Sequence, residues 1–278
     1  MSYAVRSLSG GWPFVKPITF AHISDTHVDS NRDATLRGGQ PLANLKRAVQ
    51  EILALPKPVD FVLHTGDVCG GVSSSVGVVD GYRNVTKSIA MFTVPCYFTL
   101  GNHDHPQIAF HHLPFPAHER LIDTDPWSYT FRCNDIFAIV LNARIDDRGR
   151  GELSQEHLIG LQNVLRSTPD PTIIAIHFTP LMAGQYWNDT HMLLSNGEQL
   201  HNILKRHAQR IRGVFFGHLH RPFQRLYDGI LYVCGPSTAY GIDFWCGETR
   251  PRILHQRSVG WNWVRISERG TEIRFMAW

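Results

Sequence analysis

The four residues Gly101-Asn102-His103-Asp104 constrain the fold of this chain more than any other stretch. They follow the apolar run 94–100, which reads V-P-C-Y-F-T-L. A short apolar run bounded by a turn predicts a buried strand, and a glycine turn leaves the following side chains free to face a ligand. Because α/β proteins bind ligands at the carboxyl ends of their strands, the stretch predicts such a fold with chemistry at a strand end. The alternative is a turn whose histidine is only structural.

Four other apolar runs end in the same way and decide between these readings. Runs 18–23, 59–63, 172–176 and 213–216 lead into Asp25 and His27, Asp67, His177, and His218 and His220, respectively. Residues two apart in an extended segment point to the same side, so each Asp-x-His or His-x-His pair can face one centre. A lone histidine at a strand end is usually structural, but the repetition at matching ends makes coincidence a poor explanation. The pattern therefore indicates a metal site.

Strands and helices alternate in the first part of the chain, which supports the α/β interpretation. Helices are predicted over 41–55, 82–92, 155–165 and 198–211. Further strands are predicted over 127–132, 136–141, 231–233, 261–266 and 272–275. Ser154 is a predicted helix cap, residues 70–79 are predicted to form a loop, and the tail from Phe223 onward favours antiparallel sheet. With no internal repeat or dividing linker, we expect a single domain over 1–278.

Composition excludes several classes of protein. The chain has 278 residues, of which 43% are hydrophobic and 18% charged, as in globular proteins. A net charge of +3 is too small to predict binding to long nucleic acid or to an anionic membrane, and no run reaches membrane-spanning length. The five cysteines are odd in number and lack a Cys-x-x-Cys motif, which favours reduced thiols and a cytoplasmic location.

The order of these motifs resembles the calcineurin-like metallophosphoesterase superfamily. Its pattern of Asp-x-His, Gly-Asp, Gly-Asn-His-Asp/Glu, His and Gly-His-x-His is matched from Asp25 through His220. The resemblance implies an α/β fold, a four-layer α/β/β/α sandwich of two mixed β-sheets flanked by helices. It also implies a metal held by Asp25, His27, Asp67 and His220, and another held by Asp67, Asn102, His177 and His218. Asp67 would bridge the two ions.

The predicted ligands also make chemical sense by themselves. Carboxylate, amide and imidazole groups without a thiolate suit two divalent ions such as Mn²⁺, Fe²⁺ or Zn²⁺ rather than Ca²⁺. A shared carboxylate would hold them roughly 3.5–4 Å apart, and a bridging hydroxide would attack phosphorus in line. The resemblance implies that His103 contacts the phosphoryl group and protonates the leaving oxygen. Asp104 is expected to orient His103.

Sequence differences from two other branches of the superfamily narrow the set of enzymes that this chain resembles. Protein serine/threonine phosphatases carry glutamate where this chain has Asp104, and purple acid phosphatases carry tyrosine where it has Gly70. The chain is most similar to the class III cyclic nucleotide phosphodiesterases. Two positions differ: aspartate is more usual at Asn142, and many relatives have a second histidine where Phe178 follows His177.

The substrate is expected to be a small phosphodiester, with a 3′,5′-cyclic nucleotide as the leading candidate. Substrate contacts are assigned to Asn102 and His103, together with Tyr186, Trp187 and Trp245, which lie on predicted loops. Such aromatic side chains can stack on a base, although each is also a candidate for core burial. A phosphomonoesterase, a nuclease and a non-catalytic metal-bound scaffold are the alternatives, and a homodimer is left open.

The remaining histidines are not expected to bind metal. His22 and His64 lie on predicted strands and are expected to be satisfied core residues or supports for ligands. Solvated positions are expected for the histidines on predicted helices, His157, His201 and His207. A place at the mouth of the pocket is expected for those that follow the Gly101–Asp104 turn, His105, His111 and His112.

Overall fold

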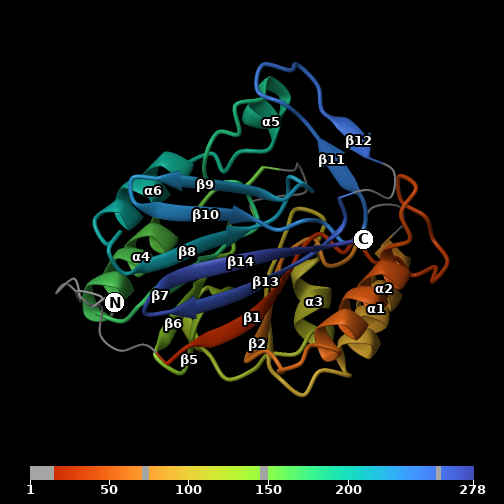
Figure 1. The fold of residues 1–278 in the computed structure, drawn as a ribbon, viewed down its shortest axis with the longest axis horizontal. Helices are drawn as coiled ribbons and strands as arrows, with labels where there is room; N and C mark the ends of the chain where they lie inside the picture. Colours follow the sequence, from red (N-terminus) through yellow and green to blue (C-terminus); the bar gives the residue numbers. More distant parts are fainter. Residues whose placement is uncertain (1–15, 71–74, 145–149, 255–257) are drawn as a thin grey trace, which may run out of the picture.

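Two β-sheets form the centre of the molecule in a computed structural model, which describes residues 16–70, 75–144, 150–254 and 258–278 (Figure 1). The first sheet has the order β14-β13-β1-β2-β3. Its strands are β1 (Ile18–Ile23), β2 (Phe61–Thr65), β3 (Cys96–Thr99), β13 (Gly260–Ser267) and β14 (Gly270–Ala277). β1, β2 and β3 are parallel, so the residues that follow them emerge at the same edge of the sheet. β13 returns antiparallel to β1 and pairs with β14.

The second sheet has the order β4-β5-β6-β7-β8-β10-β9. Its strands are β4 (Glu119–Ile122), β5 (Asp125–Cys133), β6 (Ile136–Val140), β7 (Thr172–Ala175), β8 (Ile211–Phe216), β9 (Phe223–Tyr227) and β10 (Ile230–Cys234). The predicted β5-β6 hairpin is present. The expectation of a wholly antiparallel tail is wrong for β10: β9 reverses the chain at the edge, so that β10 returns parallel to β8. A separate small sheet pairs β11 (Gly241–Asp243) with β12 (Arg252–Leu254).

The helices are α1 (Pro41–Leu53), α2 (Ser75–Ile89), α3 (Pro106–His112), α4 (Gln155–Ser167), α5 (Tyr186–His191) and α6 (Gly197–Lys205). Ser154 caps α4 as predicted, since its hydroxyl accepts a hydrogen bond from the His157 amide. The start of α2 and the end of α6 differ from the prediction, and a helix forms in one predicted loop. α2 begins inside the predicted loop, because Val78 and Val85 share an apolar face with Tyr82. α6 ends at Lys205, because residues 206–210 form turns and Ile211 already begins β8. The segment expected as a loop around Tyr186 contains α5.

Three apolar layers hold the sheets and helices together. Between the sheets, aromatic rings interlock: Phe20 stacks on Phe61 at 4.7 Å, and Tyr97 stacks on Phe131 of the opposite sheet at 3.5 Å. Helices α1 and α2 cover the outer face of the first sheet, while α4 and α6 cover that of the second (Figure 1). This is the predicted four-layer sandwich. Within the described part of the chain, the helices are too short or too polar to traverse a bilayer.

Candidate metal centre

The polar residues predicted from the sequence come together where the two sheets meet. β1, β2 and β3 deliver Asp25, His27, Asp67 and Asn102 from one sheet, and β7 and β8 deliver His177, His218 and His220 from the other. Parallel strands make this possible, because their carboxyl ends share an edge. Two groups of possible metal ligands result, each with ligand atoms within 4.8 Å of one another.

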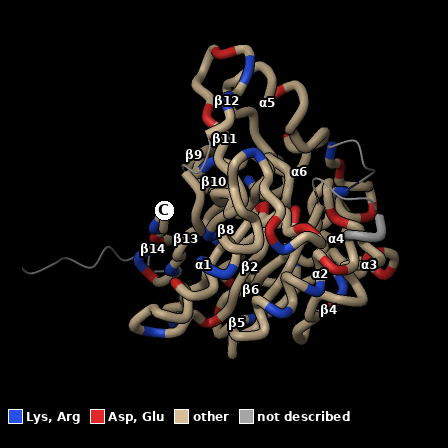
Figure 2. Tube along the Cα trace, turned by 90° about the vertical axis from the view of Figure 1, so that its right-hand side faces the viewer, with Lys and Arg blue, Asp and Glu red and all other residues tan. Residues whose placement is uncertain are grey.

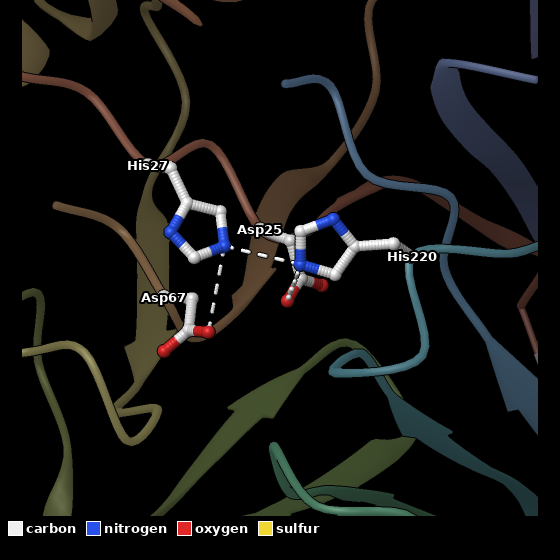
Figure 3. A group of neighbouring side chains, drawn as sticks. All are labelled: Asp25, His27, Asp67 and His220. Atoms are coloured by element: carbon white, nitrogen blue, oxygen red, sulfur yellow. Dashed lines mark hydrogen bonds and ion pairs between the residues drawn. The ribbon is translucent and has the colours of Figure 1, made fainter. Parts of the chain in front are cut away.

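The first group consists of Asp25, His27, Asp67 and His220, all buried (Figure 3). The Nε2 atoms of His27 and His220 lie 3.1 Å apart. Nε2 of His27 is 3.5 Å from Oδ2 of Asp67, and Nε2 of His220 is 3.3 Å from Oδ1 of Asp25. Figure 3 shows the four side chains pointing toward one another, Asp25 and His27 from the segment after β1, and Asp67 and His220 from two other segments.

The second group consists of Asp67, His177 and His218, with Asn102 beside it. Nε2 of His177 lies 3.0 Å from Nδ1 of His218, 3.3 Å from Oδ1 of Asn102 and 3.5 Å from Oδ2 of Asp67. The same Asp67 oxygen therefore faces His27 in one group and His177 in the other. Asp67 is the one residue common to both groups of described ligands.

Hydrogen bonds to carbonyl oxygens fix the tautomers of three of these histidines. Nδ1 of His27 donates to the Gly70 carbonyl at 3.0 Å, and Nδ1 of His220 donates to the Tyr240 carbonyl at 3.1 Å. A carbonyl can only accept, so in the neutral rings each Nε2 presents a lone pair to the centre. His177 is held in the same way by the Thr65 carbonyl at 2.7 Å.

This arrangement fits a cation. In the neutral rings, the Nε2 lone pairs of His27 and His220 face each other beside two carboxylates. Atoms bound to one ion at about 2.1 Å lie roughly 3.0–3.4 Å apart in octahedral or tetrahedral coordination, close to the spacings in both groups. The residues present therefore suit divalent metal ions.

Burial sets the charge state of the ligands. It lowers the pKa of His27 to about 4 and that of His218 to about 3, so both are neutral at pH 7, as metal binding requires. Burial opposes ionisation of Asp67, but the neighbouring His177 outweighs it and holds the pKa of the carboxyl well below its usual range. Burial likewise opposes charge on His177, yet the Asp67 carboxylate raises its pKa to about 9 in the metal-free protein.

Backbone strain is concentrated in the same residues. Asp25, His27, Asp67, His218 and His220 all have φ between 45° and 67°, in the left-handed region that non-glycine residues rarely occupy. Such conformations cost of order 1–3 kcal/mol each and persist where the surrounding structure enforces them, typically at functional sites. Gly101 leaves room for Asp67 in this conformation, because a Cβ there would lie 2.1 Å from Oδ1 of Asp67.

His103 and Asp104 occupy different environments. His103 is exposed, its ring centroid is 5.0 Å from that of His27, and its amide donates to Oδ1 of Asp67 at 2.9 Å. Asp104 is buried and accepts hydrogen bonds from the amides of Val68, Cys69 and Gly101 and from the Tyr82 hydroxyl. The expectation that Asp104 orients the His103 ring is therefore wrong. The carboxylate instead holds together the two turns that carry Asp67 and Asn102.

The predicted aromatic contacts lie around α5 and the β11–β12 sheet. The side chains of Tyr186 and Trp245 are 69% and 62% exposed, which sets aside core burial for both. The Trp187 ring stacks on His191. Trp245 packs against Arg221, the residue that follows His220, with the guanidinium carbon 5.3 Å from the indole centroid.

Sequence reasoning missed Tyr240, whose ring centroid lies 4.2 Å from that of His220 and 6.0 Å from that of His27. Its place after a strand and a Gly-Pro turn was the available signal. His201 is also not solvated as expected: it is buried, and its Nδ1 pairs with the Tyr232 hydroxyl at 2.8 Å. His22 and His64 are buried and hydrogen-bonded, as predicted.

Known proteins that resemble this chain include phosphodiesterases and a phosphatase. A sequence model described as Calcineurin-like phosphoesterase matches residues 18–222. A 3′,5′-cyclic-nucleotide phosphodiesterase of Nostoc sp. is 26% identical over 92% of this chain and 90% of its own length. A 3′,5′-cyclic adenosine monophosphate phosphodiesterase of Escherichia coli K12 is 25% identical over 91% and 87%. The solved structure of a dimetal phosphatase from Danio rerio shares the fold, with a TM-score of 0.65 and 15% identity over 93% of this chain and 98% of the other.

Proposed function

The chain belongs to the calcineurin-like phosphoesterase family, and we propose that it hydrolyses small phosphodiesters at a dinuclear metal centre, with 3′,5′-cyclic nucleotides as its leading substrates. The predicted class of metal-dependent phosphodiesterase agrees with the family match and with the relatives named as cyclic nucleotide phosphodiesterases. The observation that carries the dinuclear proposal is the position of Asp67, whose Oδ2 atom lies 3.5 Å from a histidine nitrogen of each ligand group.

The two proposed ions share Asp67 and are otherwise held by different residues. Asp25, His27, Asp67 and His220 would hold one ion, and Asp67, Asn102, His177 and His218 the other. Nitrogen and oxygen donors of this kind suit Mn²⁺, Fe²⁺ or Zn²⁺. Two such ions held by these residues would supply neutralising charge for the phosphoryl oxygens and would lower the pKa of a bound water.

The chain's own groups would bind the phosphoryl group and move the proton. His103 is exposed beside the ligands, and its backbone is anchored on Asp67, so its ring is free to reach a substrate without leaving the centre. We assign it the transfer of a proton to the leaving oxygen. Half-buried Asn102 would contact a phosphoryl oxygen through its amide.

Exposed aromatic side chains support a substrate with a base. Trp245 and Tyr186 offer rings to stack on, and Trp245 packs against Arg221, the residue after His220. Figure 2 shows Lys and Arg interspersed with Asp and Glu over the described residues in that view, without the continuous basic track that a long nucleic acid favours. A single nucleotide fits these features better than a polymer.

The test compares substrates under fixed metal conditions. Protein stripped of metal is reconstituted separately with Mn²⁺, Fe²⁺ and Zn²⁺, and kcat/KM is measured for cyclic AMP, a glycerophosphodiester, a bis-aryl phosphodiester and an aryl phosphomonoester. The glycerophosphodiester is included because a relative from Arcobacter nitrofigilis, 26% identical over 79% of this chain, is named as a probable glycerophosphodiester phosphodiesterase. Cyclic AMP is expected to give the highest value. A preference for the monoester would favour the phosphomonoesterase alternative.

A further inference from the structure

A line of buried hydrogen bonds runs from the C-terminal strand β13 to the candidate ligand Asp25. Nδ2 of Asn262 lies 3.3 Å from Nδ1 of His22, which is its direct cross-strand neighbour on β1. Nε2 of His22 lies 2.9 Å from the Thr65 hydroxyl, and that hydroxyl donates to Ser24 at 2.8 Å. Ser24 then donates to Oδ2 of Asp25 at 2.5 Å. All five side chains are at most 2% exposed.

The chemistry of the two ends gives this line one direction. An amide NH₂ can only donate, so its contact places a lone pair on Nδ1 of His22 and the proton on Nε2. The ring then donates to Thr65, which leaves the Thr65 proton for Ser24 and the Ser24 proton for the carboxylate. Asp25 can only accept, so the series ends there. Burial lowers the pKa of His22 to about 3, which keeps the ring neutral with a single proton to donate.

Water has little room to replace these bonds. Gly217 and Gly235, from the second sheet, press against the line: a Cβ on Gly217 would lie 2.0 Å from Oγ of Ser24, and one on Gly235 would lie 2.9 Å from Cε1 of His22. The Phe215 ring packs edge-on against His22 with centroids 5.5 Å apart. The line is therefore sealed between the two sheets.

We propose that Asn262, His22, Thr65 and Ser24 form a positioning relay that fixes Oδ2 of Asp25 and so presents Oδ1 to the metal. Oδ1 is the atom that lies 3.3 Å from Nε2 of His220. Asn262 lies on β13, outside residues 18–222, which the family model matches. The relay therefore uses a strand outside the matched residues to support Asp25, which lies near their start. The proposal rests on the metal centre proposed above.

The relay is tested with variants that interrupt it without changing a ligand. Thr65→Val removes the middle hydroxyl at nearly constant volume, Asn262→Leu removes the first donor, and Thr65→Ser keeps the hydroxyl. Thr99→Val is the matched control: Thr99 is also fully buried, pairs with Thr65 across β2 and β3, and donates to the Leu141 carbonyl instead of to the relay. The binding of Co²⁺ alone is followed by its visible absorption and by competition with a chelator.

The relay predicts that Thr65→Val and Asn262→Leu each weaken Co²⁺ binding roughly tenfold or more, as loss of a group supporting a ligand typically does. The double variant should lose about as much as one single variant, because both changes interrupt the same line, whereas independent packing defects would add. Thr65→Ser and Thr99→Val should bind like the wild type. Unchanged binding in Thr65→Val and Asn262→Leu, or additive losses, would overturn the relay.

A second measurement does not need any variant to fold. In metal-free wild-type protein with ¹⁵N-labelled histidine, His22 is expected to be neutral with its proton on Nε2, and a proton on Nδ1 would overturn the proposed direction. Failure of the wild type to bind Co²⁺ would overturn the metal centre instead. The two proposals therefore fail separately.

Discussion

The Tyr82 hydroxyl donates a hydrogen bond of 2.8 Å to Oδ1 of Asp104, and so connects helix α2 to the turn that carries Asn102 and His103. The same carboxylate accepts from the Gly101 amide at 2.9 Å and from the Val68 amide at 3.0 Å. One buried acidic side chain therefore ties a helix to two strand ends. The role of Asp104 in the metal centre is structural, since its hydrogen bonds position the neighbouring backbone.

This arrangement predicts unequal losses for two nearly isosteric changes. Tyr82→Phe removes one donor from Asp104 and the acceptor of the His105 amide, and should lower the free energy of unfolding by about 1 kcal/mol. Asp104→Asn places an NH₂ group among donors that need an acceptor, and should cost about 1–3 kcal/mol. Urea unfolding in the presence of a chelator measures both. A larger loss for Tyr82→Phe than for Asp104→Asn would contradict the assignment.

Asp67→Ala should abolish binding of both metal ions, because Oδ2 of Asp67 faces both ligand groups. Elemental analysis of metal-reconstituted protein is expected to give two ions per chain for the wild type and none for the variant. Asp170→Ala is the control, since its carboxylate pairs with exposed Arg132. One ion or none in the wild type, or one retained in Asp67→Ala, would contradict the shared-ligand proposal.

His103→Ala should keep both ions and lose activity. His103 is exposed and outside both ligand groups, and a positioned proton donor typically contributes ~10²–10⁴-fold to the rate. The loss in kcat should shrink for substrates whose leaving group needs no proton. His207→Ala, at a histidine that precedes β8 and so lies at the other end of that strand from His218, serves as the control. Loss of metal from His103→Ala, or wild-type activity on a poor leaving group, would show that the role is wrong.

Trp245→Ala should weaken turnover of substrates that carry a base. Stacking contributes about 1–3 kcal/mol per base, which is roughly a 5- to 150-fold change in kcat/KM. Arg221→Gln should act in the same direction, because the guanidinium holds the indole and donates to Asp243. A glycerophosphodiester, which has no base, should be little affected, as should Tyr227→Ala at an exposed ring on β9. Equal losses for both substrates would argue against stacking.

The layers and the candidate ligands were predictable because both depend on local pattern. Apolar runs mark buried strands, and residues that follow neighbouring parallel strands must share an edge, so Asp25 and Asp67 could be placed together without coordinates. The direction of β10 was not predictable, since only its pairing partner defines it. The contacts of Asp104 were missed for a related reason: its neighbours in sequence suggested His103, whereas burial presented it with Val68 and Tyr82 from other elements.

Acid should destabilise the metal-free protein through buried histidines that stay neutral. Nδ1 of His64 accepts from the Gly66 amide at 3.2 Å, and its Nε2 lies 3.1 Å from the Thr26 hydroxyl, which itself donates to the Val68 carbonyl. The ring is therefore held as the Nε2–H tautomer, and burial lowers its pKa to about 3.

The direction of the pH effect follows from the protonation of His64 in the folded and the unfolded protein. An unfolded histidine has a pKa of about 6.5, so as the pH falls below that value the unfolded chain gains a proton that folded His64 refuses until about pH 3. The free energy of unfolding should then fall by up to about 1.4 kcal/mol per pH unit for this residue. His177, with its pKa raised to about 9, contributes stability that is complete below pH 6.5 and lost toward pH 9, so it does not affect the slope between pH 6 and 4.5.

His64→Gln should therefore reduce the slope of the free energy of unfolding against pH by about one proton between pH 6 and 4.5. The variant should also be less stable at pH 7, because glutamine does not match the shape of the buried imidazole. Urea unfolding at several pH values in chelator gives the slope for the wild type and the variant. His111→Gln, at an exposed position, should leave the slope unchanged. An unchanged slope in His64→Gln would mean that folded His64 already binds a proton in this range, contrary to its buried, hydrogen-bonded neutral state.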